Sequence, residues 1–353
     1  FVSKDGYRMT GAAVPRETGR VELRLSRRSE PIAPLVTTRL TKEQREKILK
    51  QLLRPVYARM LEVQNDYFAG QILEMLAPYD RQYARDRVLD RMVHRTLLVL
   101  KFFGLGDGTL AVFGGGGEED SRIISGLITQ DQRQDQRLTH LPESGYHRLA
   151  LGRAVVLFDA GAPAEGAFST GAHAGCLSFE MSSGAHRMVV ICGAFAGRDL
   201  NWQRALRSTP AHSTLTLDER SQATVLTDGL LARLLGHRLI GGPIGVETRR
   251  LESAHGLSVE ASHDAYVAHY GLVHQRRMTL SRGGFTLTGA DRIIPVNPNP
   301  PSGHRDARNG VPYAVRFHIH PDVKLSLAQG GSSVILKLPN REGWRFRCGG
   351  GDL

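Results

Sequence analysis

Apolar residues recur at helical spacing in the first third of the chain. Within residues 41–70, the side chains of Ile48, Leu52 and Val56 fall on one face of a helix. Pro55 lies inside this pattern and predicts a kink or a break, because proline lacks a backbone donor. Further helices are expected over residues 71–76, 81–103 and 122–130.

From about Leu141 the helical period ends, and short apolar runs alternate with Gly, Pro, Asn and Asp turns. These runs predict strands near 154–160, 176–181, 187–192, 213–217, 244–251, 257–261, 272–280, 285–289, 314–318, 324–327, 332–338 and 344–347. Many short strands at this spacing are typical of an antiparallel sandwich. The chain is therefore expected to be an α+β protein, in which a helical region precedes an antiparallel β-sandwich.

Three other segments lack a regular pattern. Residues 1–40 are basic and predict an irregular arm. Residues 104–120 contain no phosphate-binding motif and predict a turn, a short strand at Thr109–Phe113 and a flexible glycine loop. Residues 295–312 carry several prolines and predict an exposed loop, because a central strand needs backbone donors.

The composition is that of a folded protein with a basic surface. The chain has 353 residues, of which 41% are hydrophobic, and this is enough for two domains with cores. The formal net charge of +11 predicts attraction to polyanions, and an ordinary solvated basic surface is the alternative. Aromatic residues make up 7% and no nucleic-acid-binding motif is found, so nucleic-acid binding through the basic arm ranks last.

Several classes of segment are not expected. No apolar stretch reaches about 18 residues, so no membrane span is predicted. The chain begins with Phe1, which predicts a fragment or a processed product, and no signal peptide is visible in it. Cys176, Cys192 and Cys348 form no close-spaced metal or redox motif. Cys176 and Cys192 are expected to be small buried residues, and a disulfide between them is the alternative.

Six stretches carry a more specific signal. They are SGYHRL (144–149), AHAGCLSFEMSSG (172–184), RSTPAHSTLTLD (207–218), SHDAYVAHYGLVHQRRMTL (262–280), TGADRI (288–293) and RFHIHPDVKLSLAQGG (316–331). In this order they resemble the C-terminal β-sandwich domain of the heparinase II/III-like polysaccharide lyases. The segment KFFGLGDGTLAVFGG (101–115) is similar to the end of the family's helical domain.

The resemblance implies a partial (α/α) toroid-type helical region at 41–135 and a sandwich at 141–350, after the basic arm at 1–40. It implies β-elimination of a uronate-containing acidic polysaccharide, in a cleft between the two parts that supply tyrosine and histidine catalysts. The helical region is shorter than a full toroid. Groups that contact the substrate in relatives are therefore expected to be missing from this chain.

β-Elimination requires a cation for the uronate carboxylate, a base for the C5 proton and an acid for the departing oxygen. Tyr146 is the first acid/base candidate, with His147 beside it, and His263 is the second. A packing tyrosine and a hydrogen-bonded turn histidine are the respective alternatives. The predicted substrate contacts are Arg207, Tyr266, Arg276 and Arg277, and ordinary solubility at strand edges is the alternative for the arginines.

His173 and His212 match two histidines that, by the same resemblance, bind zinc in some relatives. The third ligand in those relatives is an aspartate whose position falls here at Ile191 or Cys192, and a Cys192 thiolate is the only substitute. Where relatives carry an aspartate two residues after the first histidine, this chain has Gly175. A zinc ion at His173 and His212 is one possibility, and direct or indirect substrate contact is the other.

The leading hypothesis is a secreted polysaccharide lyase of the periplasm or cell envelope. The runner-up is a non-catalytic sandwich protein that binds an anionic glycan or cell-wall polymer. The oligomeric state, the identity of the sugar and its sulfation are not set by the sequence.

Overall fold

The computed structural model describes residues 7–9, 25–27, 87–117, 120–129, 137–195, 197, 199–227, 229–296, 311–331 and 333–349. The chain divides into two compact units, Phe1–Tyr57 and Ala58–Leu353. In the first unit, β1 (Tyr7–Met9) pairs antiparallel with β2 (Leu25–Arg27), so this part of the predicted irregular arm is a strand pair. The helices predicted over 41–70 and 71–76 lie outside the described residues.

The second unit is built on two antiparallel sheets. The larger sheet has the order β16-β7-β6-β5-β4-β3. Its strands are β3 (His140–Leu141), β4 (Tyr146–Leu151), β5 (Ala154–Asp159), β6 (Phe179–Ser183), β7 (His186–Val190) and β16 (His318–Ile319). The other sheet is a meander of β11 (Val246–Ser253), β12 (Gly256–His263), β13 (Leu272–Ser281) and β14 (Leu287–Pro295).

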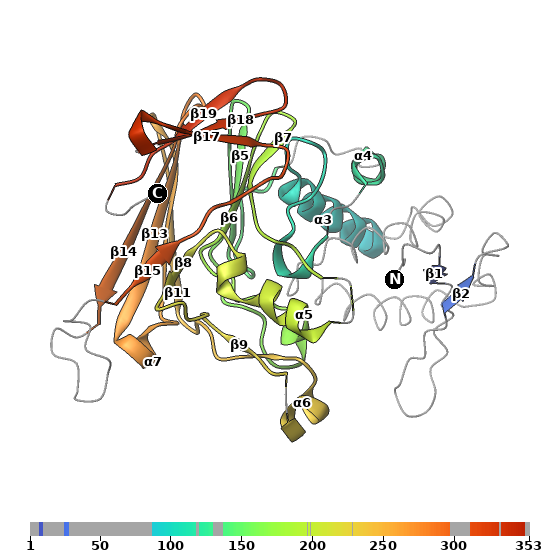
Figure 1. The fold of residues 1–353 in the computed structure, drawn as a ribbon. Coiled ribbons are helices and arrows are strands. Elements are labelled where there is room, and N and C mark those ends of the chain that lie inside the picture. Colours follow the sequence, from blue (N-terminus) through green and yellow to red (C-terminus); the bar gives the residue numbers. More distant parts are fainter. Residues whose placement is uncertain are drawn as a thin grey trace. The chain divides into compact units, whose positions relative to one another are not determined.

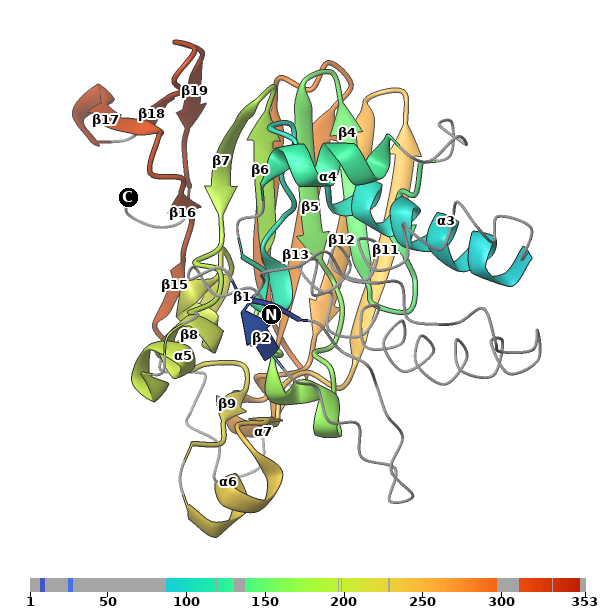
Figure 2. The ribbon, with the colours of Figure 1, turned by 90° about the vertical axis from the view of Figure 1, so that its right-hand side faces the viewer.

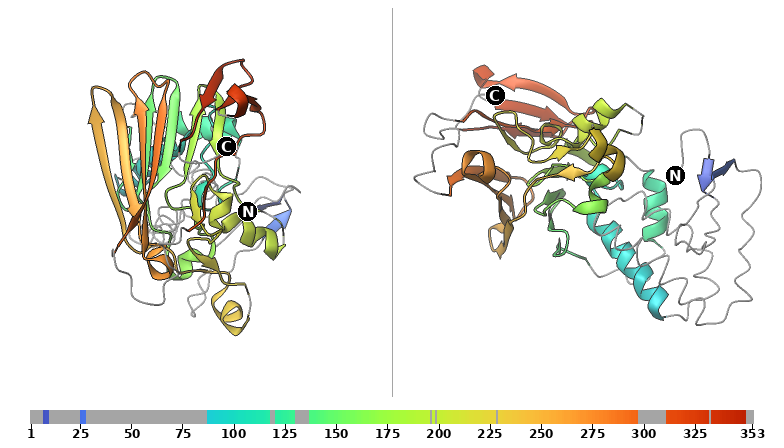
Figure 3. Two further views of the ribbon diagram at one scale, coloured as in Figure 1. Left: turned by 60° about the vertical axis from the view of Figure 1, so that its left-hand side comes forward. Right: turned by 90° about the horizontal axis from the view of Figure 1, so that it is seen from below.

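The two sheets face each other across a hydrophobic core (Figure 3). Val156 and Phe158 of β5 pack in one cluster with Val259 of β12 and Met278 of β13. The alternation of buried and less buried residues along β13 follows the period of two in a strand. The predicted antiparallel sandwich and α+β class are confirmed.

Helices cover the outer face of the six-stranded sheet. Figure 1 shows the four-stranded sheet, the six-stranded sheet and α3 (Arg87–Phe103) as successive layers, and Figure 2 shows α3 with α4 (Ser121–Ile128) in front of β4, β5 and β6. The backbone N–H of Gly106 donates to Ser182 Oγ at 3.0 Å. Glu180 Oε1 accepts from the N–H of Val112 at 2.9 Å and its other oxygen lies 2.7 Å from Arg187.

Smaller elements close the ends of the sandwich. The sheet of β17 (Lys324–Ala328), β18 (Ser333–Lys337) and β19 (Gly343–Phe346) adds Leu336 and Leu338 to the core. Two strand pairs and several short helices complete the unit: β8 (Leu215–Leu217) with β15 (Tyr313–Val315), β9 (Thr224–Val225) with β10 (Leu239–Ile240), α5 (Leu200–Arg207), α6 (Gly229–Leu235), α7 (Val267–Tyr270), η2 (Phe113–Gly115), η3 (Gly166–Thr170), η4 (Thr209–Ala211) and η6 (Gln329–Gly331).

Two sequence predictions were wrong. Thr109–Phe113 is not a strand, because Ala111 N–H bonds back to Phe103 and the N–H of Val112 is taken by Glu180. Cys192 is exposed rather than buried, while Cys176 is buried, and no disulfide joins any two of the three cysteines. Within the described residues, no helix has the length and apolar character needed to cross a membrane.

The Glu180–Arg187 ion pair is expected to be essential for stability, since both side chains are almost fully buried. Glu180→Gln should lower the free energy of unfolding by about 3–5 kcal/mol, because it leaves the buried guanidinium without this carboxylate. The matched control is Glu260→Gln, which removes an exposed pair with Arg277 and should cost at most about 1 kcal/mol. Equal losses for both variants in denaturant titrations would contradict this account.

Candidate functional site

A pocket of about 350 Å³ opens at the end of the six-stranded sheet where β4 begins with Tyr146. Five segments form its wall: the η2 turn, the start of β4, the loop after β5, the loop that carries His173, and His212 directly after η4. The lining residues that bear chemistry are Glu143, Ser144, Tyr146, Asp159, Glu165, Phe168, His173, Cys176 and His212. A cavity of this size is typical of a small-ligand site.

Tyr146 and Asp159 form one wall as direct cross-strand partners of β4 and β5. The Tyr146 ring is 6% exposed and packs edge-to-face against Phe103 and Phe113, at centroid distances of 5.2 and 5.1 Å. Its hydroxyl donates to the Asp159 carboxyl. Burial raises the pKa of Asp159 to about 7, although this hydrogen bond and one from Gly161 N–H oppose the shift.

His173 and His212 form the opposite wall through a direct hydrogen bond. His173 Nδ1 lies 3.2 Å from His212 Nε2, and the rings are nearly perpendicular. His212 Nδ1 lies 2.8 Å from the carbonyl oxygen of Ser208, which can only accept, so Nδ1 carries the proton. His212 Nε2 then accepts from His173 Nδ1–H, and His173 Nε2 keeps a free lone pair.

Burial keeps both rings neutral. It lowers the pKa of His212 to about 4, and it lowers the pKa of His173 further below the ordinary range, with the nearby His212 and Arg207 adding to the effect. The pair is therefore uncharged at neutral pH.

Two glycines give the histidines their space. A Cβ atom on residue 175 would lie 2.5 Å from His212 Cδ2, so the His212 ring occupies the place of any larger side chain there. Gly115, with φ of +91°, brings the glycine loop against His173, and a Cβ there would lie 3.7 Å from Nε2. The glycine loop predicted to be flexible thus borders this site.

No Lys or Arg is among the described residues that line the pocket. The nearest candidate, Arg207, is buried behind the His173 loop. Its guanidinium donates to the carbonyl oxygens of Ala172, Ser169 and His237 at 2.7–2.8 Å. Burial lowers the pKa of Arg207 to about 10, and its donors hold the loop in place.

The residues present do not fit a zinc ion. His173 and His212 are joined by a hydrogen bond through one ring proton. Ile191 is buried, and its side chain has no atom that can bind a metal. Cys192 Sγ instead lies 3.5 Å from His318 Nδ1. Across the described part of the chain, no group of three or more His, Cys, Asp or Glu side chains is placed to hold a metal, whereas zinc takes about four ligands.

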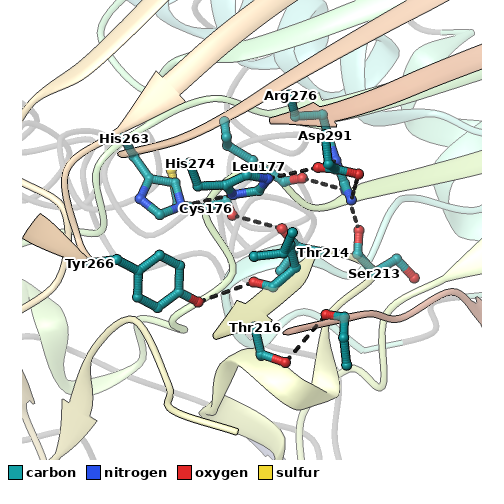
Figure 4. A network of polar contacts seen from close by, with 12 residues as sticks. Cys176, Leu177, Ser213, Thr214, Thr216, His263, Tyr266, His274, Arg276 and Asp291 are labelled. Atoms are coloured by element: carbon teal, nitrogen blue, oxygen red, sulfur yellow. Dashed lines mark hydrogen bonds and ion pairs between the residues drawn. The ribbon is translucent and has the colours of Figure 1, made fainter. Parts of the chain in front are cut away.

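A second polar cluster, built on residues of β12, β13 and β14 outside the pocket lining, lies inside the sandwich (Figure 4). His263 Nε2 lies 3.2 Å from His274 Nδ1, and His274 Nε2 lies 2.7 Å from Asp291 Oδ1. Arg276, only 1% exposed, donates to both Asp291 oxygens and to the carbonyls of Leu177 and Ser213.

This cluster ties β13 and β14 to the loops of the other layer. Burial alone would raise the pKa of Asp291, and the charge of Arg276 with hydrogen bonds from His274 and Arg276 lowers it below the ordinary range. Tyr266 extends the cluster by donating its hydroxyl to the carbonyl of Leu215 at 3.1 Å. The buried polar groups of the cluster hydrogen-bond to one another and to backbone carbonyls.

The nine residues singled out from the sequence therefore fall into five places. Tyr146, His173 and His212 line the pocket together. His263, Tyr266 and Arg276 belong to the internal cluster, Arg207 lies behind the pocket, and His147 points to the opposite face of β4, where its Nε2 lies 2.9 Å from Thr248 Oγ1. Arg277, on an outward position of β13, pairs with Glu260. Their predicted roles stay predictions.

Sequence reasoning missed Asp159, Glu143 and Glu165 as pocket residues. Asp159 lies near the end of a predicted strand, at 154–160. The feature that could have identified Asp159 is the hairpin of β4 and β5, whose register pairs Asp159 with Tyr146. Glu143 and Glu165 lie in loops, which carry no periodic signal.

Comparison with known proteins gives the following matches. The family model described as heparinase II/III-like, C-terminal, matches residues 133–353. FtsZ-localized protein C of Caulobacter vibrioides is 33% identical over 259 residues, which cover 73% of this chain and 44% of that protein. The chain thus spans less than half the length of this relative.

Solved structures share the fold. The heparan sulfate lyase HepC from Pedobacter heparinus superposes with a TM-score of 0.56 at 15% identity, over 80% of this chain and 44% of that chain. The heparinase III-BT4657 gene product superposes with a TM-score of 0.56 at 12% identity, over 84% of this chain and 47% of that chain.

Gly175→Ala is expected to displace the His212 ring and break its hydrogen bond to His173, because the new Cβ has no room. The free energy of unfolding should fall by about 1–3 kcal/mol. Gly126→Ala in α4 is the control, since nothing lies within 4 Å of its Cβ position and alanine favours a helix. Urea titrations that show no loss for Gly175→Ala would refute the steric argument.

Asp159 should make stability depend on pH. Its folded-state pKa of about 7 lies above that of an unfolded aspartate, about 3.9, so the folded protein binds the proton more tightly. Its contribution to the free energy of unfolding is therefore most favourable below about pH 4 and is lost as the pH rises to about 7. The stability of Asp159→Asn minus that of the wild type should rise over this window, and a flat difference would contradict the assignment.

Proposed function

Because the chain belongs to the heparinase II/III-like family, we propose that it is a carbohydrate-binding member that holds a saccharide in the Tyr146–His173–His212 pocket without cleaving it. The family takes its name from polysaccharide lyases, and the pocket brings one tyrosine and two histidines together. The observation that carries the proposal is the charge of the lining, in which carboxylates are present and no described cation is.

A uronate lyase must neutralise the carboxylate next to the carbon that loses its proton, and a guanidinium or an ammonium ordinarily does so. Arg207, Arg276 and Arg277 were the predicted candidates, and the third lies outside the pocket lining in an ion pair with Glu260. The first donates to three backbone carbonyls and the second to Asp291 and two carbonyls, so both guanidinium groups are already engaged. This speaks against uronate chemistry in the pocket.

The acid/base groups are also poorly matched to elimination. His212, whose pKa is about 4, is too weak a base at neutral pH to remove a carbon-bound proton efficiently. Its Nε2 lone pair is occupied by the proton of His173. The Tyr146 hydroxyl points at Asp159, and ionising it beside a carboxylate would be unfavourable.

The same features suit ligand binding. The pocket offers the exposed ring of Phe168, the lone pair of His173 Nε2 and several carboxylate oxygens, which together can hold the apolar face and the hydroxyls of a sugar. The name of the relative from Caulobacter vibrioides describes localisation with FtsZ and no reaction. A binding role in this chain is consistent with that name. The predicted periplasmic or envelope location stays a prediction.

The intact protein should give no rise in ultraviolet absorbance with any of a panel of uronate polymers, since each elimination would create a conjugated end. It should nevertheless bind saccharides by isothermal titration calorimetry, and Phe168→Ala should weaken that binding about 5- to 30-fold. Ile244→Ala, at an exposed residue outside the pocket lining, is the control and should bind like the wild type.

The lyase alternative keeps one observation in its favour, the meeting of Tyr146, His173 and His212 in one pocket. Steady growth of absorbance that disappears in Tyr146→Phe would establish it and refute the non-catalytic proposal. Absence of binding to every saccharide would refute the carbohydrate-binding part.

A further inference from the structure

The ligand class of the pocket can be narrowed further, on the assumption that the proposed function holds. We propose that the pocket selects a saccharide bearing protonated amines, a hexosamine, and rejects the uronates on which lyases of this family type act.

Three carboxylates converge on the pocket from separate segments. Glu143 precedes β4, Asp159 ends β5 and Glu165 immediately precedes η3. Glu143 and Glu165 are exposed, while Asp159 is enclosed at the wall. Among the described contacts, no Lys or Arg forms an ion pair with any of the three. Glu143 and Glu165 therefore offer negative charge to a ligand, and Asp159, whose pKa burial raises to about 7, adds a partial charge near neutral pH.

The basic residues behind the pocket do not cancel this charge at its surface. Arg207 directs its donors to Ala172, Ser169 and His237. Arg148, on the same face of β4 as Tyr146, donates to the carbonyls of Phe102 and Gly104 at 2.7 and 2.6 Å. Both guanidinium groups donate their hydrogen bonds to backbone carbonyls. The pocket therefore keeps an acidic lining in a protein whose formal net charge is +11.

The histidine pair strengthens the preference. Because His173 uses its Nδ1 proton on His212, its Nε2 presents an acceptor. Most of the polar groups that face a ligand are therefore hydrogen-bond acceptors. An ammonium group supplies three donors and a positive charge, whereas a uronate would set a carboxylate against carboxylates and a lone pair. The same lining attracts one class of sugar and repels the other.

The test compares three tetrasaccharides of equal length by isothermal titration calorimetry: fully de-N-acetylated chitotetraose, its N-acetylated form and a tetra-uronate. The amine form is expected to bind at least about tenfold more tightly than the uronate, with the N-acetylated form between them. The advantage of the amine form should shrink at high salt, since exposed charges are screened.

Variants tie the preference to the named residues. Glu165→Gln, at an exposed position, and Asp159→Asn should each weaken binding of the amine form about threefold to tenfold, and change the N-acetylated form by less than about twofold. Asp322→Asn removes an exposed acid outside the pocket and should change neither. Glu165→Gln keeps the test valid if Asp159→Asn folds poorly.

The outcomes separate the two proposals. If the uronate binds as well as the amine form, or if Glu165→Gln and Asp159→Asn leave the order unchanged, the hexosamine inference is overturned while carbohydrate binding stands. If none of the three sugars nor any other saccharide binds, the proposed function itself fails.

Discussion

The hydrogen bond between His173 and His212 governs what this pocket can do. The carbonyl of Ser208 fixes the proton on His212 Nδ1, and this in turn makes His173 the donor and leaves its Nε2 as an acceptor. Gly175 is the condition for this arrangement, because any side chain there would take the space of the His212 ring. A metal-binding arrangement of the two rings would require the shared proton to leave and further ligands that the described residues do not supply.

Most other polar groups near the site serve to position it. Arg207 donates to the carbonyls of Ser169 and Ala172 in the loop that presents His173 and to the carbonyl of His237, and Glu180 joins the segment after α3 to the sheet beneath it. Arg276, held by Asp291, fastens the four-stranded sheet to the loops at Leu177 and Ser213. These side chains are of the types that catalysis uses, yet burial and mutual hydrogen bonds commit them to the fold.

The sandwich was predictable because its strands carry short apolar runs bounded by turn residues. The run at 272–280, for example, matches β13 closely. α5, α6 and α7 were not predicted, since each has at most eight residues and a helical period needs a longer window. The Thr109–Phe113 segment looked like a strand because its apolar residues are contiguous, but they are buried beneath α3 and bond to the chain itself.

The site was only partly readable from the sequence. Residue types suggested His173, His212 and Tyr146, which do meet. The same residue types suggested His263 and Arg276, but the fold engages His263 with His274, and Arg276 with Asp291 and backbone carbonyls. The charge of the pocket likewise depends on where the charged residues lie in the fold, since a basic chain presents an acidic lining here.

The central claim is that a saccharide contacts the His173–His212 pair and not the internal histidine cluster. Long-range nitrogen–proton NMR spectra of histidine-labelled protein test it directly. On addition of a binding chito-oligosaccharide, the ring nitrogens of His173 and His212 should shift, with His212 protonated at Nδ1, while those of His263 and His274 stay in place. Shifts confined to His263 and His274 would contradict the account.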